Sequence, residues 1–225
     1  MTVSILQSNY IPWKGYFDII AKSDVFVIYD EVQYTKNDWR NRNLIKTQNG
    51  LQWLTIAVKQ DSLDQKICDT QVFKTNWTQK HMNTLQTNYA KASYFKDYME
   101  IVSKIYENTS NSLSEINLQF IKTICRILEI ETKIIDSRTL KLKGDKQERL
   151  IKVCKILGAD RYLSGPAAKS YIDEKVYKEN KIELEWMDYS NYKEYNQLYP
   201  PFEHGVSVLD LIFNEGPNAR HFLNF

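Results

Sequence analysis

The apolar positions of the first sixty residues predict a strand, a helix and two further strands. Residues 3–6 are apolar enough to enter a sheet, and Pro12 suits the first turn of the helix that follows. Residues 25–29 form a continuous apolar run between two aspartates, as expected for a strand buried on both faces. A polar loop at 30–43 and a strand at 53–58 come next.

From about residue 76 to residue 130 the apolar residues recur at steps of three and four, which predicts helices. An Asn- and Ser-rich break at 108–112 divides this stretch. Ser112 and Glu115 have the spacing of a capping box, which predicts that a helix begins there. We expect a single α/β domain spanning residues 1–225, with a helical insertion or subdomain at about 76–130.

Strands and helices alternate again after residue 130. This alternation predicts a doubly wound, mainly parallel, Rossmann-like sheet with right-handed crossovers. The predicted strands are 133–135, 161–164 and 182–186, and the predicted helices are 147–157, 167–179 and a short one at 208–213.

Composition narrows the class of protein. A net charge of +2 and a pI near 8.2 give little support to extensive nucleic-acid binding, so an aminoacyl-tRNA partner is not favoured by charge. The three cysteines are widely spaced, and we find no signal peptide and no apolar run long enough to span a membrane. We therefore expect a reduced, cytoplasmic protein. The histidines lack metal-ligand spacing and no glycine-rich phosphate motif occurs, so no metal site is predicted.

Three polar loops would converge at one edge of such a sheet, because ligands of open parallel sheets bind beyond the carboxyl ends of the strands. These loops follow the strands at 3–6, 25–29 and 161–164. They predict a small-molecule site, although the aromatic rings of the first loop could instead wedge the helix against the sheet. The predicted substrate-binding residues are Gln7, Asn9, Tyr10, Trp13, Gly15, Tyr16, Gln33, Trp39, Arg40, Asn41, Arg42, Ser164 and Gly165.

The second loop carries the charged groups. Arg40 and Arg42 lie among amide side chains, and guanidinium groups bind phosphate through paired hydrogen bonds. This pattern predicts an anionic ligand such as a nucleotide or a sugar nucleotide; an Arg–Asp network bracing the loop is the alternative. Asp30 and Asp38 are candidate general bases if burial raises their pKa, and His204 in a glycine-flanked turn is a third acid/base candidate.

A second basic run leads into and along the predicted helix 147–157 and consists of Lys141, Lys143, Lys146, Arg149, Lys152 and Lys155. It is most simply a solvated helix face, because Asp145 and Glu148 offset its charge. Lys146 and Arg149, where that helix begins, are further candidates for phosphate contact.

Several of these segments resemble the WbqC-like family, over nearly the whole chain. The resemblance is carried by residues 5–17 (ILQSNYIPWKGYF), 29–34 (YDEVQY), 38–43 (DWRNRN), 157–160 (LGAD), 162–165 (YLSG) and 207–216 (SVLDLIFNEG). The family is associated with bacterial surface-polysaccharide (O-antigen, lipopolysaccharide) biosynthesis, and attachment of glycine to an amino sugar has been suggested for it.

For this chain the resemblance implies a transferase that forms an amide on the amine of a nucleotide-linked amino sugar. Arg40 and Arg42 would hold the diphosphate, aromatic side chains such as Trp13, Tyr16 and Trp39 would stack on base or sugar, and Asp30 or Asp38 would accept the ammonium proton. The acyl group would come from ATP-dependent activation or from an activated acyl or aminoacyl donor.

Two other functions stay open. The turn Trp13-x-Gly15-Tyr16 is topologically similar to the HxGH turn of adenylyl-transferring enzymes, although aromatic residues replace both histidines that would stabilise the transferring phosphoryl group. A nucleotidyl- or adenylyl-transferring enzyme is therefore one alternative. A non-catalytic sugar-nucleotide-binding protein of the same pathway is the other.

Overall fold

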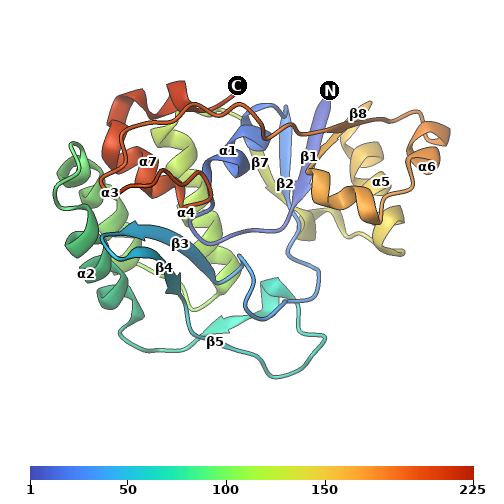
Figure 1. The fold of residues 1–225 in the computed structure, drawn as a ribbon. Helices are drawn as coiled ribbons and strands as arrows, with labels where there is room; N and C mark the ends of the chain where they lie inside the picture. The colour runs from blue at the N-terminus through green and yellow to red at the C-terminus, as the bar shows by residue number, and fades with distance from the viewer.

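A five-stranded parallel sheet forms the centre of the molecule in the computed structural model, which describes all residues 1–225 (Figure 1). Its strands lie in the order β7-β2-β1-β8-β9, and every neighbouring pair is parallel. The order reverses between β1 and β8, which is the switch point of a Rossmann-like sheet. The predicted doubly wound α/β fold is confirmed. The strands are β1 (Thr2–Leu6), β2 (Val25–Ile28), β7 (Lys133–Asp136), β8 (Arg161–Ser164) and β9 (Glu183–Trp186).

Alternating side chains of the central strands enter two separate cores. Val25 and Val27 of β2 face one core, whereas Phe26 and Ile28 face the other, because successive side chains of a strand point to opposite faces. Both faces are therefore covered, which explains why β2 is a continuous apolar run.

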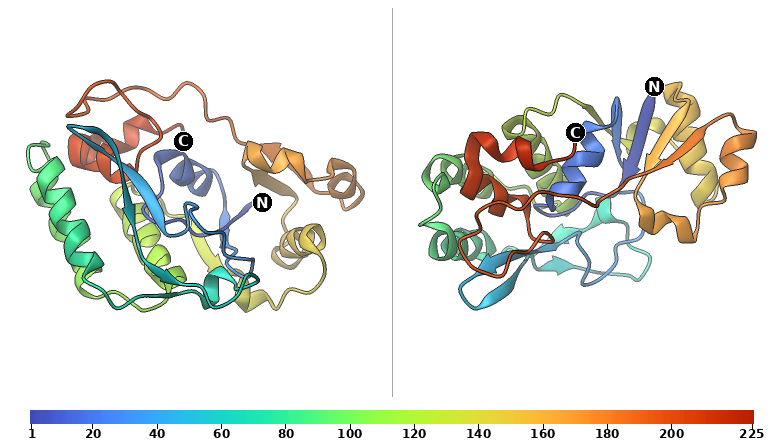
Figure 2. Two further views of the ribbon diagram at one scale, coloured as in Figure 1. Left: turned by 60° about the horizontal axis from the view of Figure 1, so that its bottom comes forward. Right: turned by 45° about the horizontal axis from the view of Figure 1, so that its top comes forward.

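Helices cover the two faces unequally (Figures 1 and 2). The larger group lies on one side and comprises α1 (Lys14–Ala21), α2 (Trp77–Tyr89), α3 (Phe95–Glu107), α4 (Leu113–Ile127) and α7 (Val208–Glu215). The other side carries α5 (Lys146–Leu157) and α6 (Glu174–Glu179). Short 3-10 helices occur at Ile67–Asp69, Ser137–Leu140, Pro166–Ser170 and Gly216–Phe222.

A β-hairpin lies beyond the carboxyl ends of the sheet strands (Figure 1). It consists of β3 (Arg42–Thr47) and β4 (Gly50–Thr55), which pair in antiparallel fashion, and a smaller pair, β5 (Val58–Lys59) and β6 (Gln71–Val72), follows. The strand predicted at 53–58 was placed too late in the chain, and β3 was missed within and after the polar loop.

The helix predicted at 167–179 is broken in two. A 3-10 helix ends at Ser170, and α6 begins at Glu174 after a new N-cap in which the Asp173 carboxylate accepts the amide N–H of Lys175 at 3.0 Å. The capping side chain starts a separate helix. The predicted cap at Ser112 is confirmed, and Gly158 and Ser207 also cap helices.

The C-terminal tail returns to the first loop. Ser207 donates its amide N–H to the Leu44 carbonyl at 2.8 Å, and Val208 donates to the Pro12 carbonyl at 2.9 Å. The segment before α7 therefore lies between the β1–α1 turn and the edge of β3. No helix combines the length and the apolar character that crossing a bilayer requires.

Candidate functional site

The turn between β1 and α1 is fixed from beneath by a buried carboxylate. Asp30 is 1% exposed; its Oδ1 accepts the amide N–H of Ser8 at 2.8 Å, and its Oδ2 accepts the hydroxyl of Ser114. Burial raises the pKa of the Asp30 carboxyl, and the hydrogen bonds from Ser114 and Ser8 act against that rise. Both carboxylate oxygens are occupied in the interior, so Asp30 holds the turn in place and is not available to a ligand.

The same turn positions an arginine at the carboxyl end of β1. The Arg40 guanidinium donates to Oδ1 of Asn9 and, at 3.2 Å, to Oε1 of Gln7. Its main-chain carbonyl accepts from Nδ2 of Asn117 at 2.8 Å, which fixes the residue from α4. The nearest carboxylate oxygen, on Asp38, is 3.7 Å away. The positive charge is thus held mainly by neutral amide oxygens, which an anion can replace.

A cavity of about 290 Å³ adjoins this arginine. It is lined by Asn9, Trp13, Trp39, Asn43 and Gly205, which come from the first loop, the second loop and the tail. Asn43 is fixed on both sides, because its Nδ2 donates to the Tyr10 carbonyl at 3.0 Å and its Oδ1 accepts from the Leu44 amide at 2.8 Å. The cavity therefore combines two indoles with two amide side chains, a set of groups suited to a polar ring.

Two backbone features aim the Trp13 side chain at the cavity. A Cβ atom at Gly15 would lie 2.3 Å from the Trp13 ring, so the indole can lie there only over a glycine. Ile11 has a φ of 37°, a conformation that costs a β-branched residue about 1–2 kcal/mol. The strained turn sends Tyr10 into the core, while Trp13 packs on Tyr189 with ring centroids 5.1 Å apart.

The third predicted loop follows a neighbouring strand, but none of its residues lines the cavity. β8 pairs directly with β1, so Ser164 and Gly165 follow the neighbouring strand at the same edge. Ser164 is buried, and its hydroxyl donates to the Tyr162 hydroxyl at 3.5 Å, whereas a Cβ at Gly165 would lie 3.7 Å from the Tyr189 hydroxyl. Tyr189 therefore packs on Trp13 with its ring and lies close to Gly165 with its hydroxyl.

Two further groups stand beside this loop. Burial raises the pKa of the Tyr171 phenol, and the positive charge of Arg40 acts against that rise. The ammonium of Lys146 lies 3.6 Å from the centroid of the Tyr171 ring. Lys146, a candidate for phosphate contact from the sequence, thus packs on the Tyr171 ring.

Tyr10, Tyr16, Gln33, Asn41 and Arg42 do not line the cavity, because their side chains make contacts elsewhere. Tyr10 is fully buried, and Tyr16 is 4% exposed and donates its hydroxyl to the Gln7 carbonyl at 2.9 Å. Gln33 donates to the Leu63 carbonyl, and Asn41 is buried and donates to the Ile56 carbonyl at 2.8 Å. Arg42 stacks on Trp53 with 4.1 Å between the guanidinium carbon and the ring centroid. Tyr10, Tyr16 and Asn41 brace the loops.

The remaining acid/base candidates differ in their access to the cavity. Asp38 is partly exposed beside Arg40, and its Oδ1 accepts the amide N–H of Trp39 at 2.7 Å. His204 precedes the cavity residue Gly205, but its ring packs on Phe202 with centroids 4.6 Å apart. Burial and the charge of Lys14 lower the His204 pKa, so the imidazole is neutral at neutral pH, and its buried Nδ1 has no hydrogen-bond partner. No group of three or more His, Cys, Asp and Glu side chains is placed to hold a metal ion.

The buried imidazole of His81 is expected to make the stability of the protein depend on pH. Its Nδ1 lies 2.8 Å from the Tyr10 hydroxyl, and its Nε2 lies 3.2 Å from the Thr55 carbonyl oxygen. The Tyr10 hydroxyl also lies 2.5 Å from the Tyr106 hydroxyl. Burial lowers the His81 pKa from 6.5 to about 4, so the unfolded chain binds more protons than the folded chain between these values. This contribution to stability is present above pH 6.5 and is lost as the pH falls toward 4, in total about 3 kcal/mol.

The variant His81→Gln isolates this effect, since buried Asp18, Asp30 and Asp210 have raised pKa values that act in the opposite direction. We expect urea unfolding of the wild type to lose about 3 kcal/mol more than that of the variant between pH 7 and pH 4. Parallel losses in the two proteins would show that His81 does not titrate in this range.

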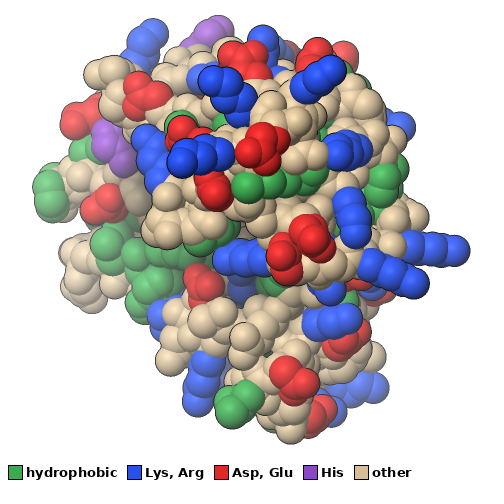
Figure 3. All heavy atoms as spheres, turned by 90° about the vertical axis from the view of Figure 1, so that its right-hand side faces the viewer, with side chains coloured by type: hydrophobic (Ala, Val, Ile, Leu, Met, Phe, Trp, Pro, Cys, Tyr) green, Lys and Arg blue, Asp and Glu red, His purple; other side chains and the backbone are tan.

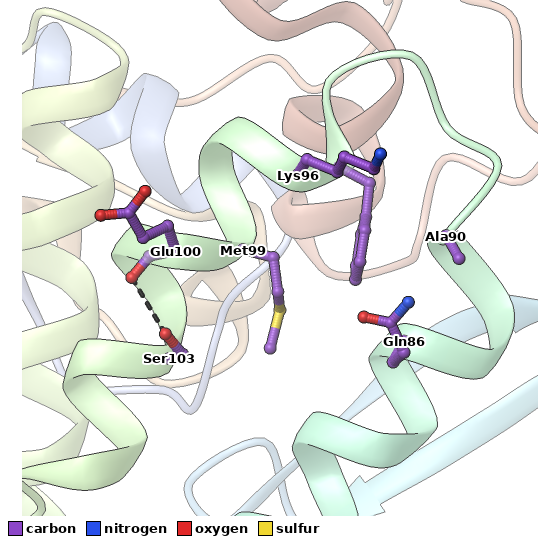
Figure 4. Close-up of a pocket in the computed structure, with 7 residues that line it drawn as sticks. Gln86, Ala90, Lys96, Met99, Glu100 and Ser103 are labelled. Atoms are coloured by element: carbon purple, nitrogen blue, oxygen red, sulfur yellow. Dashed lines mark hydrogen bonds between the residues drawn. The ribbon is translucent and has the colours of Figure 1, made fainter.

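Other hollows and charged surfaces suit a ligand less well. A cleft of about 430 Å³ between α2 and α3 is lined by Phe95 and by the residues labelled in Figure 4, and its one carboxylate, Glu100, already pairs with Lys104 at 3.0 Å. Figure 3 shows Lys and Arg spread over the face that α5 and α6 form, with Asp and Glu among them. On that face Arg149 and Lys152 donate to carbonyls of their own loop, at 2.9 and 2.6 Å. It is a solvated face.

Some residues that build the site were missed by the sequence prediction. Asn43 and Gly205 line the cavity, and Asn117 and Tyr189 support it. Asn43 belongs to the amide-rich segment 38–43, which was the available signal for it. Asn117 and Tyr189 come from distant helices and loops, and nothing in the local pattern marks them.

Comparison with known proteins gives consistent results. The model of the WbqC-like protein family matches residues 7–222. A protein of Mycobacterium tuberculosis (strain ATCC 25618 / H37Rv), named "Uncharacterized protein Rv1507c", is 45% identical over 225 residues, which cover 99% of this chain and 97% of that protein. No solved structure matches the chain.

Proposed function

The chain belongs to the WbqC-like protein family, and from the geometry of its site we propose that it binds a nucleotide-linked amino sugar at the carboxyl end of β1. We further propose that it transfers a small acyl or aminoacyl group, such as glycyl, to the amine of that sugar. This reaction would serve the biosynthesis of a bacterial surface polysaccharide.

The Arg40 guanidinium carries the proposal. It lies at the switch point of the sheet, its side chain is 16% exposed, and its hydrogen bonds go to the amide oxygens of Gln7 and Asn9, while the Asp38 carboxylate lies 3.7 Å away. A diphosphate would replace these neutral acceptors with charged ones, and charge-assisted hydrogen bonds are roughly twice as strong as neutral ones. This exchange favours binding of an anion such as a diphosphate at Arg40.

Asp38 is the group best placed to accept a proton during the reaction. The sugar ammonium must lose a proton before its nitrogen attacks the acyl carbon; the N–C bond then forms as the bond from that carbon to its leaving group breaks. The Asp38 carboxylate is partly exposed beside Arg40, so it is accessible to a ligand whose diphosphate is bound there. Asp30 lacks this access because both of its oxygens are occupied in the core.

Mass spectrometry tests the reaction directly. Purified protein is incubated with UDP- and dTDP-linked amino sugars, glycine and ATP, or with glycyl-tRNA or a glycyl thioester in place of glycine and ATP. We expect the sugar nucleotide to gain the mass of one glycyl residue with one of these donors, and the Asp38→Asn variant to slow the gain by about 10²-fold or more.

The alternatives give different outcomes in the same experiment. Binding of the sugar nucleotide without product from any donor would contradict transfer and favour a non-catalytic binding protein. Release of AMP or pyrophosphate that depends on Arg40, with no glycyl product, would favour adenylyl transfer.

A further inference from the structure

Three side chains form an exposed aromatic platform beside the cavity. Trp39 lines the cavity and is 41% exposed, and its ring centroid lies 5.3 Å from that of Trp53, which is 40% exposed. The Arg42 guanidinium stacks on the Trp53 ring. We call Trp39, Arg42 and Trp53 the indole platform.

The hairpin explains why these groups meet. Arg42 pairs with Thr55 and Leu44 pairs with Trp53, so Arg42 and Trp53 are diagonal neighbours on one face of β3 and β4. Farther along the hairpin, the tail covers this face, where Lys46 donates to Gln197 at 3.1 Å. At the end near the cavity nothing covers it, and two large aromatic rings stay in contact with solvent.

The size of the cavity favours a second binding region for a nucleotide. At about 30 Å³ for each water-sized group, 290 Å³ holds about ten such groups. This is enough for one sugar ring and its substituents, but not for a base as well. We therefore expect a nucleotide whose diphosphate contacts Arg40 to place its base outside the cavity.

We propose that the indole platform is the subsite for the nucleobase, with the ribose in the cavity and the diphosphate on Arg40; this inference rests on the proposed function. The base then lies on the platform, the ribose in the cavity and the diphosphate on Arg40. These three regions adjoin one another, because Trp39 belongs to both the platform and the cavity lining, and Asn9 lines the cavity and contacts Arg40. The acceptor amino sugar then lies beyond the diphosphate, beside Arg40 and Asp38.

Chemistry favours a base over a second sugar at this place. Every nucleobase has a flat π-face that stacks on indole rings, and a guanidinium stacks on the same kind of face. The platform carries no carboxylate or amide that would read sugar hydroxyl groups, so its recognition depends on stacking and tolerates different bases.

Calorimetry with two anions separates the platform from the phosphate site. UDP carries a base and a diphosphate, whereas inorganic pyrophosphate carries the diphosphate alone. We expect Trp53→Ala to weaken UDP binding about tenfold and to leave pyrophosphate binding unchanged, because stacking one base is worth roughly 1–3 kcal/mol. Trp53→Phe, which keeps an aromatic face, should retain most of the UDP affinity.

Arg40→Ala distinguishes the two ways in which the account can fail. If Arg40→Ala weakens both anions while Trp53→Ala weakens neither, the platform is not the base subsite, and the proposed function stands. If UDP and pyrophosphate do not depend on Arg40, the proposed function itself is contradicted. Trp53 is an exposed hairpin residue, so both substitutions at this position should leave the melting temperature nearly unchanged.

Discussion

Replacing Arg40 with alanine is expected to weaken binding of a nucleotide-linked amino sugar about 100-fold and to leave the fold intact. Two hydrogen bonds from a guanidinium to a diphosphate contribute about 3 kcal/mol in total, which corresponds to this factor. The cost to stability should be about 1 kcal/mol or less, since the Gln7 and Asn9 oxygens that lose their donor are partly exposed and water can replace it. Calorimetric titration and thermal melting of the same samples measure both effects.

Two matched variants sharpen this test. Arg40→Lys keeps the charge but loses the paired donors, so its affinity should fall between those of the wild type and the alanine variant. Arg161→Ala removes an arginine at the opposite end of the sheet, where it pairs with Glu185 at 3.0 Å, and should bind ligand normally. Equal losses of affinity in Arg40→Ala and Arg161→Ala would show that only net charge matters.

Replacing Asp30 with alanine is expected to have the largest effect on stability, a loss of about 3 kcal/mol and about 10 °C in melting temperature. The Ser8 amide and the Ser114 hydroxyl would both lose their acceptor in a buried setting, and each unsatisfied buried donor costs about 1–3 kcal/mol. Denaturant unfolding gives the loss directly.

The series Asp30→Asn, Asp30→Ala and Asp38→Asn separates support of the turn from catalysis. Asp30→Asn keeps one carbonyl oxygen for the Ser8 amide, so it should lose less stability than Asp30→Ala. Asp38 is partly exposed, and Asp38→Asn should change stability by less than about 0.5 kcal/mol. If Asp30→Asn abolished transfer while melting like the wild type, Asp30 would be the catalytic base after all.

The parallel sheet could be predicted because its strands are locally distinct. Residues 25–28 are buried on both faces and therefore apolar at every position, with Asp24 and Asp30 marking the ends. Glycine at 158 and the capping side chains at Ser112 and Ser207 mark helix ends through their own backbone requirements. These features are local, so they depend little on contacts with residues far away in the sequence.

The β3–β4 hairpin could not be predicted in the same way. β3 contains Lys46, which a period-two pattern assigns to solvent, yet Lys46 is 3% exposed because the tail near Gln197 and Pro201 covers it. The covering residues lie about 150 positions later in the chain, so the local pattern cannot show the burial.

The candidate site was predicted by position more accurately than by side chain. The segments around Asn9 and Arg40 meet as the strand order requires, but Tyr10 and Trp13, two aromatic residues of one turn, have opposite environments. His81 of α2 and Tyr106 of α3 hydrogen-bond with the Tyr10 hydroxyl and so hold Tyr10 in the core. Residue types indicated a site here; only the packing of distant helices shows which side chains face it.

A crystal structure of the protein with a bound UDP- or dTDP-linked amino sugar tests the central claim most directly. We expect diphosphate oxygens within hydrogen-bonding distance of the Arg40 guanidinium, with the Asn9 and Gln7 contacts to Arg40 lengthened or replaced. A nucleotide bound instead on the α5–α6 face or between α2 and α3, with Arg40 still bonded to Asn9 and Gln7, would contradict the claim.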